Sequence, residues 1–360
     1  MDRKRLLVIL AVSALVSWAA NATLAQEPFY QGKTIRVVVA TSPGGGFDAY
    51  TRMMTPHMGK FVPGNPAFVV ENMPGVGHLI GANHIYKVAK PDGLTLGHFQ
   101  GGLFLYQVFG RPGIEFDAKQ FEFIGSPIKE SRACALTKAS GITSVEKWLA
   151  SKTPVKLGGI GGAASDDIAR MLAATTALPI QLVAGYKGTA EIRMAAESGE
   201  LAGGCWTWDS IRATWTKAIQ SGDAVVVLQL LSKPHPELAS IPLAQSLAKS
   251  DEARQLMQAG VQDPADYYRP YVLPPRTPKD RVQILRKALQ DTMKDPDFLA
   301  DAAKSRLDID PVTGTELGKS CPRIVQTQPV HDQQTENNSV AQLMVLRESV
   351  GEIVIIKENR

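Results

Sequence analysis

The sequence predicts an α/β fold with two domains and parallel-rich sheets. Short runs of apolar, β-branched residues alternate with stretches whose apolar residues recur at helical spacing. Several runs lead through a glycine-rich turn into the next helix, an order that favours parallel sheets with ligand sites at the carboxyl ends of the strands. The length of 360 residues allows about two domains at roughly 150 residues each.

The first part of the chain gives a strand, a helix and a strand in turn. Residues 34–40 form a β-branched run broken only by Arg36. Residues 47–61 carry apolar side chains about one helical turn apart, and Pro56 should kink that helix. The further elements expected here are a strand at 68–70, a helix at 80–88 and strands at 94–99 and 121–124.

The second part continues the alternation. Its apolar runs are bounded by glycine, proline and polar residues, and amphipathic stretches lie between them. Strands are expected at 133–136, 155–157, 180–183, 201–206 and 224–231, and helices at 168–177, 190–198 and 211–219.

Composition excludes two classes of protein. With 44% hydrophobic and 21% charged residues, the chain is too apolar to be disordered. Its 39 basic and 35 acidic residues give a net charge of +4, which is too even for a dedicated nucleic-acid binder. No nucleic-acid partner is therefore expected.

The N-terminus reads as a secretory signal peptide at 1–25. Three basic residues at 3–5 precede an apolar run over 6–20, and the small residues that follow predict cleavage after Ala25, with Ala22 as the alternative. The run of about 15 residues is shorter than the 18 or more that span a bilayer, and a retained anchor is the competing interpretation. The mature protein is expected in the periplasm.

The cysteines leave two alternatives open. In an oxidising compartment three cysteines cannot all pair within one chain. Cys134 and Cys205 lie in expected strands of one domain, so a disulfide between them and two buried free thiols are both compatible with the sequence. Because no Cys-x-x-Cys or other metal-ligand spacing occurs, neither a metal nor a cofactor is expected.

Three turns contain most of the candidate ligand-binding residues. Each follows a strand and opens a helix, whose first N–H groups lack partners within the helix and suit an anion. The first turn has three glycines and no Lys or Arg, so backbone donors would hold the anion; a tight turn without a ligand is the alternative. Three helix N-termini could thus face one cleft. The candidate ligand-binding residues in these turns are Ser42, Gly44, Gly45, Gly46, Phe47, Asp48, Gly161, Ala163, Ala164, Ser165, Tyr186, Lys187, Gly188 and Thr189.

Asp48 lies in the first turn of its helix, where a carboxylate stabilises the helix start. The functional alternatives are an acceptor for a ligand amine or hydroxyl, and a support for the loop. These roles do not exclude one another.

Six short motifs follow one another in a specific order. They are Tyr-Gln-Gly-Lys-Thr-Ile-Arg from Tyr30, Pro-Gly-Gly-Gly-Phe-Asp from Pro43, Glu-Asn-Met-Pro-Gly-Val-Gly from Glu71, Pro-Asp-Gly-Leu-Thr-Leu from Pro91, Tyr-Lys-Gly-Thr-Ala from Tyr186 and Leu-Pro-Pro-Arg-Thr-Pro-Lys from Leu273. In sequence, order and spacing the series resembles the substrate-binding proteins of tripartite tricarboxylate transporters, the Bug family, over residues 29–312.

This resemblance implies a type II periplasmic binding protein, in which two α/β domains close on a small ligand. The chain would cross the hinge near 126–128 and 230–233, so that domain one combines 27–126 with 232–318 and domain two is 127–231. Family members hold carboxylates in the turns named above, partly through backbone groups and waters. The resemblance also implies integral-membrane transporter subunits as partners and a monomeric protein.

Two places depart from the family pattern. The end of the strand at 201–206 is rich in aromatic residues, and Trp206 or Trp208 could pack on an apolar part of the ligand or lie in the core. Trp206 and Asp209 therefore join the candidate ligand-binding residues. His78 stands where the family usually has glycine, and its spacing to the neighbouring histidines matches no metal-ligand motif.

The C-terminal part differs more. After Leu317 the family would continue into an amphipathic helix packed on domain one, but here Cys321 and Pro322 introduce a polar segment, and 353–356 is apolar and β-branched. Residues 319–360 are therefore predicted to form an atypical tail. One hypothesis is an altered reading frame that leaves domain one without its closing helix.

The sequence favours capture of a small carboxylate by domain closure and its delivery to a membrane transporter. An enzyme is not expected, because neither Gly-x-Ser-x-Gly nor His-Glu-x-x-His occurs. An exported hydrolase would have to pair Ser42 or Ser165 with His57 or His78. A protein of the same fold that presents its ligand to a sensor is the third alternative.

Overall fold

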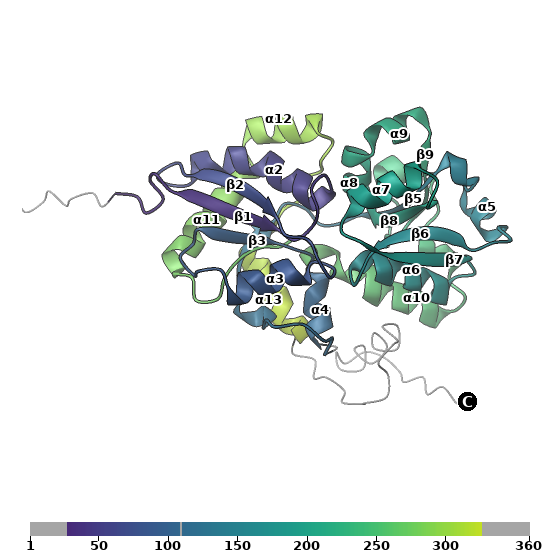
Figure 1. The fold of residues 1–360 in the computed structure, drawn as a ribbon, viewed down its shortest axis with the longest axis horizontal. Helices are drawn as coiled ribbons and strands as arrows, with labels where there is room; N and C mark the ends of the chain where they lie inside the picture. The colour runs from purple at the N-terminus through teal and green to yellow at the C-terminus, as the bar shows by residue number, and fades with distance from the viewer. Residues whose placement is uncertain (1–26, 109, 326–360) are drawn as a thin grey trace, which may run out of the picture.

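The computed structural model describes residues 27–108 and 110–325 and confirms an α/β fold. Figure 1 shows two sheets side by side, each with helices on both of its faces. This layering buries the apolar face of each amphipathic helix against a sheet. We call the part that contains the six-stranded sheet domain one and the part that contains the five-stranded sheet domain two.

The sheet of domain one mixes parallel and antiparallel pairs. Its spatial order is β11 (Val312–Thr313), β4 (Glu122–Ser126), β10 (Tyr271–Leu273), β3 (Thr95–His98), β1 (Thr34–Val39) and β2 (Ala67–Asn72). β1 pairs in parallel with β2 and β3, whereas β10 is antiparallel to β3 and β4, and β11 to β4. The helices of this domain are α2 (Gly46–Met58), α3 (Leu79–Lys87), α4 (Gly102–Val108), α11 (Lys279–Thr292), α12 (Pro296–Lys304) and α13 (Gly314–Val325).

The sheet of domain two is mixed in the same way. Its order is β7 (Ile180–Tyr186), β6 (Val155–Ile160), β8 (Gly203–Thr207), β5 (Arg132–Thr137) and β9 (Ala224–Gln229), and β5 is antiparallel to both of its neighbours. The helix predicted at 211–219 is two helices that meet at Trp215. The helices here are α5 (Val145–Leu149), α6 (Ala164–Thr175), α7 (Thr189–Glu197), α8 (Trp208–Thr214), α9 (Thr216–Ser221) and α10 (Asp251–Met257).

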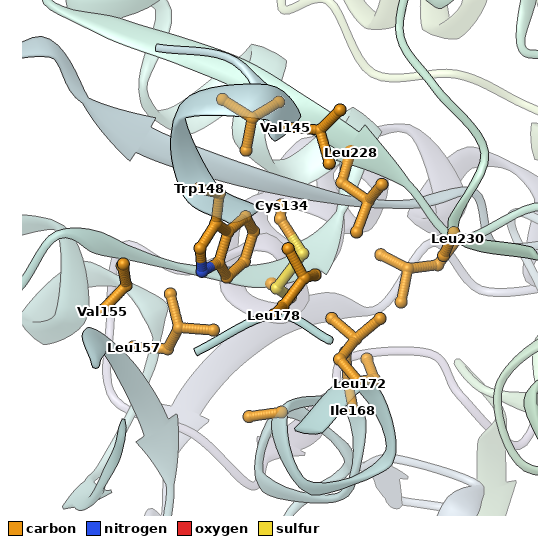
Figure 2. Close-up of a cluster of buried hydrophobic side chains, with 14 of the residues drawn as sticks. Cys134, Val145, Trp148, Val155, Leu157, Ile168, Leu172, Leu178, Leu228 and Leu230 are labelled. Carbon is orange, nitrogen blue, oxygen red and sulfur yellow. A yellow bond between two sulfur atoms is a disulfide. The ribbon is translucent and has the colours of Figure 1, made fainter. Parts of the chain in front are cut away.

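The core of domain two surrounds a disulfide bond. Cys134 on β5 and Cys205 on β8 are cross-strand partners with Cα atoms 4.0 Å apart, and the structure joins them. Figure 2 shows the bond among buried side chains that include Trp148 of α5 and Leu172 of α6. Of the two alternatives that the sequence leaves open, the structure contains the disulfide.

The chain returns to domain one later than the predicted crossing at 230–233. Residues up to 262 lie against domain two: α10 packs on α6, and Met257 and Val261 belong to the same buried cluster as Cys134. The first crossing follows β4, and the second directly precedes β10, where the Glu130 N–H donates to the Ala265 carbonyl at 3.2 Å. The segment lacks the strand periodicity by which domain two is recognised in the sequence.

The helix expected to be missing from domain one is present. α13 runs six residues beyond position 319, through the Cys321-Pro322 sequence, and packs against β4 and α4. Leu317 on this helix is 1% exposed and lies in a buried cluster with Phe104 and Phe123. A closing helix therefore covers this face of domain one.

The predicted signal peptide at 1–25 and residues 326–360 of the predicted tail lie outside the described residues. Within 27–108 and 110–325, no helix combines the length and the apolar character that crossing a membrane requires.

Candidate ligand-binding site

A cavity lies between the two domains. Among the predicted site residues, seven line it: Gly45, Gly46, Phe47, Ala163, Ser165, Thr189 and Trp206. The other lining residues were not predicted to bind a ligand. They are Thr41, His78, Glu130, Arg132, Ile160, Ile168, Cys205, Thr207, Ser210, Tyr268 and Arg269. The other predicted residues lie outside the lining, mostly next to it in the same turns.

The three turns share one local hydrogen-bond arrangement. In each, a backbone N–H at the start of the turn donates to a carboxylate four residues later, in the first turn of the helix. The bonds run from Gly44 to Asp48 at 2.9 Å, from Gly162 to Asp166 at 3.0 Å and from Lys187 to Glu191 at 2.8 Å. These N–H groups are therefore already used within the protein, and the carboxylates fix the shape of each turn.

Asp48 supports its loop. Its carboxylate also accepts from Arg52 Nε at 2.9 Å and from Asn72 Nδ2 at 3.0 Å. Burial opposes ionisation, yet the hydrogen bonds from Arg52, Gly44 and Asn72 hold the pKa of Asp48 below its ordinary value. Since three donors surround this ionised carboxylate, the role of loop support accounts for it.

The turns of the two domains contact each other directly. Ser42 N–H donates to the Lys187 carbonyl at 3.3 Å. A Cβ added at Gly45 would lie 2.9 Å from Thr189 Oγ1, and one at Gly46 would overlap the Ser210 hydroxyl. Glycine is therefore required at Gly46 by the close approach of the other domain.

Further contacts join the domains around these turns. Arg193 on α7 donates to the Gly44 carbonyl at 3.1 Å, and the Ala164 N–H donates to Gln100 Oε1 at 3.0 Å. The Ser165 hydroxyl accepts from the Ile160 N–H at 2.9 Å and so holds its own turn. The Tyr186 hydroxyl donates to Glu200, away from the cavity.

His78 occupies a backbone conformation that glycine adopts freely. Its φ of 77° lies in the left-handed region, which gives a physical reason for glycine in the family pattern. The ring is 2% exposed and packs edge-on against Phe47, and its Nδ1 accepts from the Gln100 N–H at 3.3 Å. Burial, reinforced by Arg269, lowers the pKa of His78 to about 3, so the ring is neutral at physiological pH.

The structure does not assemble the nucleophile pairs that a hydrolase would need. Among the described residues, no hydrogen bond joins Ser42 or Ser165 to His57 or His78. The His57 ring instead lies 3.0 Å from Asp301 and 3.6 Å from Asp295, on the side of α12.

A buried charged cluster lies where the chain crosses between the domains. Arg269 donates to Glu130 Oε1 at 2.9 Å, and Arg132 to Glu130 Oε2 at 3.3 Å, so one carboxylate serves two guanidinium groups. Arg269 also donates to Thr207 and Ser210 and lies 3.6 Å from Asp209. Burial raises the pKa of Glu130 to about 7, although both arginines oppose the rise.

Several donors in the cavity lining have no hydrogen-bond partner among the described residues. They include Nη2 of Arg132, Nη1 of Arg269, the indole N–H of Trp206 and the hydroxyls of Thr41 and Thr189. Arg132, Arg269 and Trp206 are 3%, 1% and 6% exposed. Because an unsatisfied buried donor costs about 1–3 kcal/mol, such a concentration of donors is typical of a site for a ligand with acceptor oxygens.

The two tryptophans have different surroundings. Trp206 lines the cavity and stacks on Trp215, with ring centroids 5.8 Å apart. Trp208 lies outside the lining, is 6% exposed and donates from its indole nitrogen to Glu237 at 2.8 Å. Only Trp206 is therefore placed to contact a ligand in this cavity.

The fold is that of two-domain periplasmic binding proteins. Similar solved structures include the periplasmic binding protein BugD and a TctC solute-binding protein from Polaromonas. The structure of the periplasmic binding protein BugD matches with a TM-score of 0.69 and 19% identity, over 89% of this chain and 99% of that one. MatC from Rhodopseudomonas palustris, with bound malate, matches with a TM-score of 0.65 and 18% identity, over 82% and 97%.

Two further proteins are similar to this chain. An R. palustris protein with adipate matches in structure with a TM-score of 0.67 and 15% identity, over 89% of this chain and 98% of that one. In sequence, a UPF0065 protein of Bordetella bronchiseptica is 27% identical over 154 residues, or 42% of this chain. The chain thus aligns with 45% of the length of that relative. No protein-family model matches the sequence.

Proposed function

We propose that the protein is a periplasmic solute-binding protein that captures a small carboxylate between its two domains and delivers it to a tripartite tricarboxylate-type transporter. The observation that carries the proposal is the cavity between the domains, where buried donors from both of them lack partners among the described residues. Donors without acceptors fit a ligand with carboxylate oxygens, which accept several hydrogen bonds at once.

The similar structures support this ligand class. MatC holds malate and the second R. palustris protein holds adipate, both of which are carboxylates. Delivery to integral-membrane subunits, export through a signal peptide at 1–25 and a monomeric state belong to the same proposal. The contacts between the turns of the two domains support closure as the means of capture.

A thermal-shift and calorimetry screen of the mature chain tests the proposal. The screen uses malate, adipate, benzoate and 2-methylpropanoate, with glucose and a neutral tripeptide as controls. A ligand stabilises the folded state by about 2.7 kcal/mol when its concentration is 100 times its Kd, so a true ligand raises the melting temperature progressively. The proposal fails if no acid shifts the transition and a neutral compound does.

Transport is tested separately in cells. Deleting the gene, or genes for a neighbouring pair of membrane subunits, should abolish uptake of the radiolabelled acid that the screen identifies. Equal uptake in both deletion strains and the parent would contradict delivery, although it would leave capture intact.

A further inference from the structure

The charged side chains of the cavity lining contact one another. They are Glu130, Arg132 and Arg269, which come from the two segments that connect the domains and from the start of β5. His78 also lines the cavity but is neutral, because burial lowers its pKa to about 3. Cationic donors for a ligand are therefore confined to Arg132 and Arg269.

The two arginines are only partly used within the protein. Each donates to a different oxygen of Glu130, and Arg132 also donates from Nη1 to the Val261 carbonyl at 2.7 Å. Nη2 of Arg132 and Nη1 of Arg269 remain without a hydrogen-bond partner in the part of the chain that the structure describes. One buried guanidinium nitrogen of each arginine thus lacks an acceptor among the described residues, whereas Nη2 of Arg269 donates to Thr207 and Ser210. Both arginines reach the same carboxylate of Glu130.

The rest of the lining carries no charged group. It consists of apolar side chains such as Phe47, Ile160 and Ile168, of the aromatic rings of Trp206 and Tyr268, and of neutral hydroxyls and backbone. A second ligand carboxylate would lie against these groups, and burying a charge without a charged partner is costly. The chemistry of this part of the lining therefore suits an apolar body that carries at most neutral polar groups.

Building on the proposed function, we propose that Arg132 and Arg269 bind the ligand carboxylate directly and that the ligand is a monocarboxylate with a compact apolar body. The carboxylate accepts hydrogen bonds from the unpartnered guanidinium nitrogens, and the body packs among the aromatic and aliphatic side chains. Charge recognition thus comes from the crossings between the domains, and the three glycine-rich turns supply shape.

The experiment measures binding of benzoate and 2-methylpropanoate, with the matching amides and adipate as probes, to the mature wild-type chain by calorimetry. The variants are Arg132→Gln, Arg132→Lys and Arg269→Gln. The matched control is Arg193→Gln, which removes a contact between the domains outside the cavity lining. Circular dichroism and ligand-free melting temperatures identify any variant that does not fold, and Arg132→Lys keeps the test valid because it retains the positive charge.

We expect the wild type to bind both monocarboxylates more tightly than adipate and at least 100-fold more tightly than the amides. Arg132→Gln and Arg269→Gln should lose at least tenfold in affinity for the acids, and Arg132→Lys should lose less. Arg193→Gln should weaken binding without changing the preference for a monocarboxylate over adipate.

Three results would overturn parts of the proposal. If the wild type binds these acids and the arginine variants bind them equally well, direct recognition by the arginines is wrong and the proposed function stands. Tighter binding of adipate than of both monocarboxylates would refute the ligand class. If no carboxylate binds the wild type at all, the proposed function itself fails.

Discussion

Arg269 and Glu130 join the two crossings between the domains through a buried ion pair, with Nε and Oε1 2.9 Å apart. The residues are 139 positions apart in the sequence, and both are at most 5% exposed. Removing one partner of such a pair leaves a buried charge uncompensated, which is strongly destabilising. The pair therefore links the two segments that connect the domains, and both of its side chains line the cavity.

Stability should depend on pH through Glu130. The pKa of Glu130 rises from 4.5 to about 7 on folding, so between these values the folded state holds more protons and its stability falls as pH rises. At 1.36 kcal/mol per unit, the loss across this window is on the order of 3 kcal/mol. The side chain at this position cannot titrate in Glu130→Gln. The unfolding free energy of the variant minus that of the wild type should therefore increase by this amount from about pH 4.5 to about pH 8.

Urea denaturation of both proteins at several pH values checks this. Comparing the two proteins cancels the contributions of other titrating groups, such as His78. Because the pKa of His78 is lowered on folding, its contribution to stability is lost as pH drops below 6.5. A constant difference between wild type and variant across the range would show that Glu130 does not titrate in this window.

Closure should be sensitive to a single methyl group at Gly46. The added Cβ of Gly46→Ala would overlap the Ser210 hydroxyl of the other domain, so the domains could not approach to the same distance. We expect at least a tenfold loss of carboxylate affinity and a larger radius of gyration by small-angle scattering. In the control Gly102→Ala the nearest atoms of other residues lie 3.9 Å from the new Cβ, and affinity should not change. Wild-type affinity in Gly46→Ala would show that closure tolerates the overlap.

The disulfide should contribute substantially to the stability of domain two. Replacing both Cys134 and Cys205 with alanine removes a cross-link that spans 71 positions, and loss of such a bond typically costs about 2–5 kcal/mol. Denaturant unfolding, followed by tryptophan fluorescence, measures the change. Reduction of the wild type should reproduce the effect of the double variant, and an oxidised wild type no more stable than the double variant would contradict the expectation.

Leu317 should matter more than its position near the end of domain one indicates. It is 1% exposed on α13, so Leu317→Ala should lower the unfolding free energy by about 2–5 kcal/mol. Thr315 is exposed on the same helix, and Thr315→Ala should change stability by no more than about 0.5 kcal/mol. Equal stabilities of the two variants would mean that α13 does not pack on domain one in solution.

Local patterns predicted the helices, strands and turns well, because the periodicity of apolar residues and the positions of glycines can be recognised within a few residues. β1 and α2 lie within one or two residues of their predicted start, and Gly45, Gly46 and Ala163 line the cavity. The hinge cluster was missed since Arg269 meets Glu130 only through tertiary packing across 139 positions. The sequence did contain one indication of this cluster, because the charged Arg132 directly precedes the apolar run 133–136.

The remaining errors also have physical reasons. The segment 232–262 was assigned to domain one because the family resemblance implied a crossing near 230–233, and its place is instead set by α10 packing on α6. Cys321 and Pro322 looked like the end of helical structure, yet α13 continues to Val325. Pattern alone does not reveal how far tertiary contacts extend a helix.

The hydrogen bonds that shape the three turns have a consequence for redesign. Each turn is shaped by a carboxylate four residues away, so these hydrogen bonds lie within segments of five residues. Lining side chains outside these segments, such as Ile160 and Ile168, could therefore be exchanged while the hydrogen bonds that shape the turns are kept. The frame of each turn and the side chains that face the cavity from outside the turns can in this way change separately.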